Sequence, residues 1–197
     1  AVDKLGNKSA IKCSNAYKVD SKAPTVSSSV SSSTQNAAKT WYKSIALQVN
    51  ATDDTSNIQY IKYCLTTSSS CTPSITYSSA VSLIDSASKS VSSKICYQAT
   101  DNAGNTSDTQ CSPKYQVDST APTASTLSKS GSTLSATGTD SQSKIAASCL
   151  STSSSSCSSS WAASTSVTSP YTAKYTISKA GTYYIHFKDS VGNIKYN

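Results

Sequence analysis

Short runs in which apolar and polar residues alternate recur along the whole chain, and polar turn residues separate them. In residues 45–51 (IALQVNA) every second position is apolar, as expected for a strand with one buried face. Further strands are expected over 58–64, 95–99, 145–150 and 181–187, of which the last shows the same alternation around His186. No stretch keeps the 3.6-residue period of an amphipathic helix. The pattern predicts an all-β protein.

The number and spacing of these runs indicate a particular kind of β fold. Weaker strands are expected over 25–30, 75–84 and 89–93, and a last strand ends at Val117. About seven short strands in about 100 residues, separated by polar turns, are typical of an immunoglobulin-like β-sandwich. Residues beyond 118 repeat this plan in shorter form, with a final strand that is clipped at Asn197.

One segment of the chain occurs twice in similar form. Residues 101–123 read DNAGNTSDTQCSPKYQVDSTAPT, and residues 3–25 read DKLGNKSAIKCSNAYKVDSKAPT, so the second copy starts 98 residues (101 − 3) after the first. The start of the segment recurs once more at 189–193 (DSVGN). Repetition with this period indicates a tandem array of small domains. We therefore expect 1–18 to be the C-terminal strand of a preceding repeat, 19–118 one domain, and 119–197 a shorter one. The chain is then an excerpt of a longer protein.

These motifs resemble the tandem bacterial immunoglobulin-like repeats of large surface proteins and adhesins. The resemblance rests on D-x-x-G-N at 3–7, 101–105 and 189–193, and on the joints VDSKAPT (19–25) and VDSTAPT (117–123). It implies a structural or adhesive repeat region of a secreted or cell-surface protein, without enzymatic activity, that acts as a semi-rigid stalk presenting a binding surface. Its implied partners are the neighbouring repeats of the same chain and host or matrix glycans or proteins.

The seven cysteines fit this plan. Cys96 lies five residues before Asp101 and Cys111 lies six after Asn105, so a hairpin centred on that turn brings the two thiols face to face. Two equivalent shorter loops pair Cys64 with Cys71 and Cys149 with Cys157. Cys13 is then unpaired by truncation, because its partner falls before the first residue. Disulfides in thin domains predict an extracellular location. Zinc is disfavoured, since the chain has one His and no CxxC.

The charge of the chain excludes some partners. All 17 basic residues are Lys and all 10 acidic residues are Asp, for a net charge of +7. Bidentate recognition of guanine and of phosphate depends largely on Arg, so scattered Lys residues do not predict nucleic-acid binding. No apolar run approaches the ~20 residues of a membrane span, so we expect no membrane insertion within this segment.

Aspartates mark the strongest candidate site. In a seven-strand sandwich the incoming linker, the turn after the second strand and the last hairpin turn lie at one end. The residues expected to converge there are Asp20, Asp53 or Asp54, and Asp101 in the first domain, and Asp118, Asp140 and Asp189 in the second. Carboxylate oxygens are ligands that Ca²⁺ prefers, and some related adhesin repeats hold Ca²⁺ at their joints. Alternatively, each Asp only accepts hydrogen bonds from its own turn. The sequence leaves both interpretations open.

Other functions have weaker support. Trp41 and Trp161, with Tyr42 and Tyr171, could stack on sugars in a carbohydrate-binding module of an extracellular enzyme, although core packing is the more ordinary role of such residues. A self-assembling filament subunit is a third possibility, in which 1–18 completes the sandwich of another chain. Asn7, Asn50 and Asn105 lie in N-x-S/T sequons. His186 alternates with apolar neighbours and is expected in a sheet, not in a catalytic triad.

Overall fold

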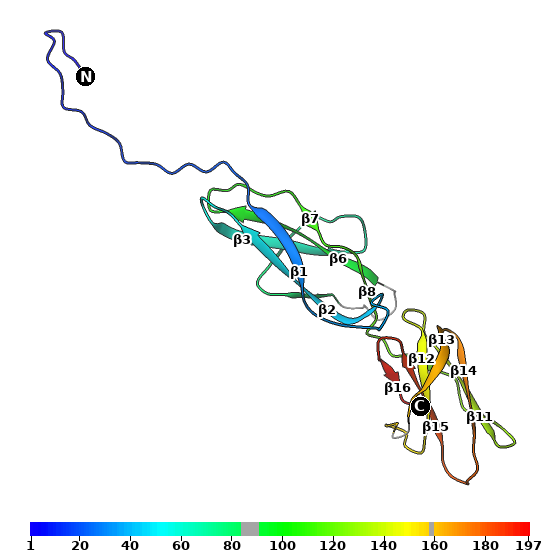
Figure 1. Cartoon of the computed structure of the whole chain (residues 1–197). Helices are drawn as coiled ribbons and strands as arrows, with labels where there is room; N and C mark the ends of the chain where they lie inside the picture. The colour runs from blue at the N-terminus through cyan, green and yellow to red at the C-terminus, as the bar shows by residue number, and fades with distance from the viewer. Residues whose placement is uncertain (84–90, 158–159) are drawn as a thin grey trace.

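The computed structural model describes residues 1–83, 91–157 and 160–197, and within these residues it contains strands and turns but no helix. The all-β prediction is thus confirmed for the described residues. Figure 1 shows an extended N-terminal segment followed by two β-sheet bodies. We refer to residues 19–118 as the first module and to residues 119–197 as the second module, because each has its own cluster of buried apolar side chains. Within the described ranges, no helix is long and apolar enough to cross a membrane.

The first module is organised around one long strand that belongs to two groups of strands. The strands are β1 (Thr25–Gln35), β2 (Tyr42–Thr52), β3 (Ile58–Thr66), β4 (Ile75–Thr76), β5 (Val81–Leu83), β6 (Val91–Asp101), β7 (Gln110–Cys111) and β8 (Tyr115–Val117). The beginning of β6 pairs with β8, and its remainder pairs with β3 and β7. Strand β2 pairs with β1 and β5 and touches β8 in parallel. Alternate β2 residues Ile45, Leu47 and Val49 are buried in the core, as the period of two predicts.

The second module has two four-stranded sheets. Its strands are β9 (Thr123–Ala124), β10 (Ser128–Ser130), β11 (Thr133–Thr139), β12 (Ile145–Ser151), β13 (Ala162–Thr168), β14 (Tyr171–Thr176), β15 (Tyr184–Asp189) and β16 (Ile194–Lys195). One sheet has the order β10-β11-β14, with β9 also on β11, and the other has the order β13-β12-β15-β16. Phe187, Ile185 and Ile145 of the second sheet and Leu134 of the first belong to one buried cluster. The arrangement is consistent with a β-sandwich.

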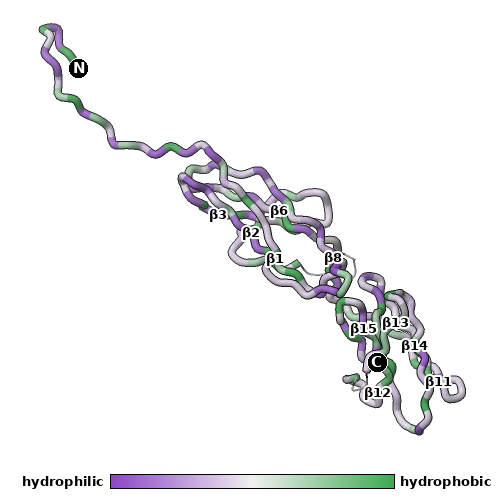
Figure 2. The backbone as a smooth tube through the Cα atoms, viewed as in Figure 1, coloured by the Kyte–Doolittle hydropathy of each residue, from purple (hydrophilic) through white to green (hydrophobic). Residues whose placement is uncertain are grey.

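The alternation seen in the sequence is visible along both modules. Figure 2 shows short apolar segments interspersed with polar ones, and no long apolar run. Several strand limits differ from the expectation: β1 continues to Gln35, β13 was not predicted, and 75–84 contains two short strands instead of one. Residues 84–90, on which the ends of two predicted strands fall, lie outside the described residues.

The N-terminal segment, residues 1–19, is exposed along its whole length. A bridge between Val2 and Lys8 closes the turn at 3–7. Residues 9–17, expected to form a strand of a preceding repeat, are extended and pair with no strand in the part of the chain that is described.

The three cysteine pairs expected from the spacing are at disulfide distance. The Cα atoms of Cys96 and Cys111 are 4.0 Å apart, and the two residues face each other across β6 and β7. The Cys64–Cys71 and Cys149–Cys157 pairs each have a Cα separation of 6.3 Å. Cys13 is free and exposed. The first module therefore has two cross-links and the second has one.

Candidate cation sites at the two joints

The D-x-x-G-N turn is built from hydrogen bonds between its own residues. In the first module, Asp101 Oδ1 accepts hydrogen bonds from the backbone N–H groups of Ala103 (2.9 Å) and Asn105 (2.8 Å). The Asn105 side-chain amide donates to Asp101 Oδ2 at 2.8 Å. Gly104 has φ of 92°, a left-handed conformation that glycine adopts without steric cost. These contacts explain why Asp, Gly and Asn occupy fixed positions in the motif.

The other two copies of the motif fold in the same way. The Asn7 amide donates to Asp3 Oδ2, and the Asn193 amide donates to Asp189 Oδ2, each at 2.8 Å. The backbone N–H groups of the same two Asn residues donate to the Oδ1 atoms at 2.9 and 2.8 Å. The copy at 3–7 is exposed, so the motif forms its turn without support from a surrounding module. The shape of the turn is therefore a local property of the sequence.

In each module the Asn of the D-x-x-G-N motif also donates hydrogen bonds to the incoming linker. Asn105 Nδ2 donates to the carbonyl oxygen of Asp20 at 3.2 Å. Asn193 Nδ2 donates to the carbonyl oxygens of Asp118 (3.0 Å) and Thr120 (3.2 Å). This contact brings the linker carboxylate to the hairpin carboxylate in both modules. This role of Asn was not predicted from the sequence, although the recurrence of Asn at the fifth position of the motif was a signal for it.

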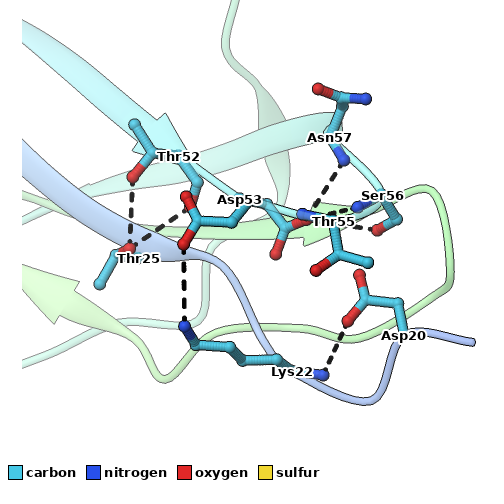
Figure 3. Close-up of polar contacts among 9 residues, drawn as sticks. Asp20, Lys22, Thr25, Thr52, Asp53, Thr55, Ser56 and Asn57 are labelled. Atoms are coloured by element: carbon cyan, nitrogen blue, oxygen red, sulfur yellow. Dashed lines mark hydrogen bonds and ion pairs between the residues drawn. The ribbon is translucent and has the colours of Figure 1, made fainter.

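The third carboxylate comes from the turn after the second long strand. In the first module, Asp53 Oδ1 accepts hydrogen bonds from the backbone N–H groups of Thr55 (3.0 Å), Ser56 (2.8 Å) and Asn57 (3.2 Å), as Figure 3 shows. Asn57 ends the turn with φ of 64°. Figure 3 also shows the carboxylate of Asp20 accepting the backbone N–H of Lys22, at 3.0 Å. Both carboxylates thus have one oxygen engaged by backbone donors.

The second module builds the corresponding turn with different residues. Asp140 Oδ1 accepts the backbone N–H groups of Gln142 and Lys144, both at 2.8 Å. Lys144 has φ of 70° and takes the place of Asn57 at the end of the turn. Asn is common in the left-handed region and Lys is not, so the turn geometry is preserved at some steric cost.

In each module the three carboxylates meet. One side-chain oxygen of each lies within 4.8 Å of the oxygens of the other two. We define the first site as Asp20, Asp53 and Asp101, and the second site as Asp118, Asp140 and Asp189. Asp54, the alternative to Asp53, lies outside the first site, because its side chain is 89% exposed and pairs with Lys22 Nζ at 3.9 Å.

The two sites differ in burial and in the proton affinity of their carboxylates. In the first site Asp20 and Asp53 are half-buried, and the backbone N–H of Ser56 lowers the pKa of Asp53. Burial raises the pKa of Asp101, but the hydrogen bonds from the side chain and backbone of Asn105 outweigh it, so the pKa lies below its usual value. Asp53 and Asp101 of the first site are therefore stabilised as carboxylate anions.

All three carboxylates of the second site are buried. Burial raises the pKa of Asp118, and the nearby charge of Asp140 adds to this effect. Burial raises the pKa of Asp189 to about 6, and the charges of Asp118 and Asp140 contribute. Among the described residues no Lys lies within 4 Å of these carboxylates as an ion-pair partner. Several buried negative charges without a counter-charge are costly unless a cation or a proton neutralises them.

The donor atoms at both sites fit a hard cation such as Ca²⁺. Asp20 Oδ2, a member of the first site, is buried and has no hydrogen-bond partner. At the second site Ser143 donates its backbone N–H to Asp118 Oδ2 at 3.1 Å, and its buried hydroxyl lies beside the same carboxylate. Three carboxylates with nearby hydroxyl and carbonyl oxygens are the ligand types that Ca²⁺ takes. The residues that would hold it are the six Asp of the two sites.

Each site also opens to solvent. A cavity of about 370 Å³ beside the first site is lined by Lys18, Asp20, Thr55, Ser56, Asn102 and Ala103. A cavity of about 260 Å³ beside the second site is lined in part by Thr120, Asp140 and Gln142. The linker and the turn that contains the third carboxylate contribute to both cavities. Of the six carboxylates, Asp20 lines the first cavity and Asp140 lines the second.

The glycosylation sequons differ in their availability. The amide of Asn105 donates to Asp101 and to the linker, and the exposed Asn7 donates to Asp3, so a glycan on either would replace a hydrogen of an amide that a turn uses. Asn50 is exposed on β2. Of the three sequons, Asn50 is the one whose modification leaves the turns intact.

The aromatic residues do not form one platform. Trp41 precedes the first module's β2, and Trp161 lies in the second module with Lys188 Nζ 4.7 Å from its ring centre. Tyr42 and Tyr171 pack against the two separate cores. The structure therefore does not bring together the residues proposed for sugar stacking.

His186 has a structural environment. Its side chain is fully buried, with Nε2 2.8 Å from the carbonyl oxygen of Ser153 and Nδ1 accepting the N–H of Asn197 at 3.1 Å. A neutral ring that donates from Nε2 and accepts at Nδ1 satisfies both contacts. His186 thereby connects the Cys149–Cys157 loop to the end of the last hairpin.

Comparison with known proteins adds no family to this geometry: a scan of protein-family models, a search of curated proteins and a search of solved structures each find no match.

Proposed function

We propose that this chain is a spacer segment of an extracellular protein, made of immunoglobulin-like modules in series whose joints bind Ca²⁺. The observation that carries the proposal is the recurrence of one three-carboxylate site at the start of each module. Each site takes one Asp from the linker and two from turns of the module that follows. A cation held by all three carboxylates restricts the linker relative to the module.

The remaining features support a mechanical role better than a catalytic one. The linkers are short and each contains a proline, Pro24 or Pro122, that is buried and limits backbone rotation. The disulfides suit an oxidising, extracellular compartment. The polar groups that converge are carboxylates engaged by turn N–H donors, and His186 has both ring nitrogens occupied by backbone partners.

Calorimetric titration with CaCl₂ of chelator-treated protein tests the proposal. We expect two binding events in the wild-type chain, and one in either Asp53→Asn or Asp140→Asn. Thermal unfolding should shift upward with Ca²⁺, because a ligand that binds only the folded state stabilises it by mass action. Asp54→Asn is the matched control, since Asp54 neighbours Asp53 but lies outside the site. Identical melting curves with Ca²⁺ and with chelator would remove the metal from the proposal.

A further inference from the structure

The second site is attached to the first module through residues 36–43. The backbone N–H of Asp118 donates to the carbonyl oxygen of Tyr42 at 2.8 Å. Lys43 Nζ donates to the carbonyl oxygen of Gly192, in the turn that holds Asp189, at 3.3 Å. Asp118 is thus anchored within the first module, of which it is the last residue, and the turn that holds Asp189 is contacted by Lys43 of the same module.

A second contact reinforces this attachment. The side-chain amide of Asn36 donates to Ser190 Oγ at 3.4 Å, and Ser190 Oγ donates to the carbonyl oxygen of Ser143 at 2.7 Å. Ser190 directly follows Asp189, and Ser143 contacts Asp118. The turn that holds Asp189 is thus fixed by both modules at once. These contacts connect the 189–193 turn to residues 36–43.

Lys43 differs from the other groups in this contact because it carries a charge. Its ammonium is partly buried on the 189–193 turn, where the negative charges of the second site are only partly screened by solvent. Lys43 is too far from the carboxylates for a direct ion pair, as the described residues include only the Lys22–Asp54 pair within 4.0 Å. Its contact with the site is therefore through the backbone of the 189–193 turn and not through a carboxylate.

We propose that Lys43 of the first module couples the two modules through the second site. Its positive charge partly offsets the charge of the three carboxylates when no cation is bound, and it opposes the charge of a cation that enters. Lys43 therefore holds the joint in the cation-free state and lowers the affinity of the site for Ca²⁺. This inference rests on the proposed function, because it requires that the second site binds the cation.

The test is a pair of calorimetric titrations with CaCl₂ in an Asp53→Asn background, in which only the second site binds. Lys43→Gln should raise the Ca²⁺ affinity about three- to tenfold at low ionic strength, and less in high salt. Lys43→Arg, which keeps the charge, should retain the affinity of its parent. Lys62→Gln is the matched control, because Lys62 is also a half-buried strand residue of the first module but is placed on β3, over the Tyr60 ring.

A second measurement reads the joint itself. NMR relaxation measures the rotational correlation time of each module. In chelator, the correlation times of the two modules should differ more from each other in Lys43→Gln than in the wild type. With Ca²⁺ bound, the variant and the wild type should behave alike. If the Ca²⁺ affinity is unchanged in Lys43→Gln, or rises equally in Lys62→Gln, the role of Lys43 is overturned but the proposed function is not. Absence of any Ca²⁺ binding by the wild-type chain overturns the proposed function as well, so the two failures are distinguishable.

Discussion

The side-chain amide of Asn193 donates a hydrogen bond to the backbone carbonyl of Asp118, 75 residues away, at 3.0 Å. Through this contact the last hairpin of the second module fixes the linker that enters it. Asn105 makes the equivalent contact to Asp20 at 3.2 Å. Both three-carboxylate sites depend on this clamp, because it sets the distance between the linker Asp and the hairpin Asp.

Removing the clamp should destabilise the second module more than the first. Asn193 is 6% exposed and donates to three oxygens, so Asn193→Ala leaves buried acceptors unsatisfied and should cost about 2–3 kcal/mol of unfolding free energy. Asn105→Ala, at a half-buried position, should cost about 1 kcal/mol. Denaturant unfolding measures both. Asn7→Ala is the control, since it occupies the same motif in an exposed turn, and a loss as large as that of Asn193→Ala would contradict the clamp.

The second module should become more stable as the pH falls when no cation is present. Burial raises the pKa of Asp189 to about 6 from its ordinary value of 3.8, so the folded state binds a proton more tightly than the unfolded state. Unfolding free energy in chelator should therefore rise between about pH 7 and pH 4, by on the order of 1–2 kcal/mol once solvent screening is allowed for.

The pH effect has a specific control. In Asp189→Asn the carboxylate with the more strongly raised pKa is absent, so the rise in unfolding free energy over this pH range should shrink to the smaller part that the buried Asp118 contributes, whatever the starting stability of the variant. A rise of the same size in Asp189→Asn would show that another group is responsible.

The core of the second module should not tolerate a side chain at Gly138. A Cβ at this position would lie 2.5 Å from Cδ1 of the Phe187 ring, which is completely buried. Gly138→Ala must displace the ring and should cost about 1–3 kcal/mol in denaturant unfolding. At Gly181 the nearest atom to an added Cβ is 3.5 Å away, in Tyr183, so Gly181→Ala should be nearly neutral. Equal effects of the two variants would argue against the tight contact.

Reduction of the disulfides should affect the first module more than the second. The bridges close loops of 7, 15 and 8 residues, and the first two belong to the first module. Each bridge restricts the unfolded chain and should thereby add about 2–3 kcal/mol to the unfolding free energy. Calorimetric melting with and without reductant should show the larger shift for the first module, which loses two bridges against one. Equal shifts for the two modules would count against this account.

Much of the fold and part of the candidate site follow from local sequence. The period of two in 45–51 predicts a strand because alternate side chains of a strand face the core, and Ile45, Leu47 and Val49 are indeed buried. The D-x-x-G-N turn forms even at exposed residues 3–7, because its hydrogen bonds connect residues at most four positions apart. The cysteine spacing around the Asp101 turn likewise leads to Cys96 facing Cys111 across the hairpin.

Tertiary packing determines how these local parts are used. Packing brings Asp53 and not Asp54 to the first site, buries the second site more deeply than the first, and places Lys43 on the turn next to Asp189. It also added β13, which the sequence pattern did not reveal. The physical reason is that a turn is determined by hydrogen bonds between neighbours in the sequence. Burial and the surrounding charges instead depend on segments that the sequence keeps far apart and that packing brings together.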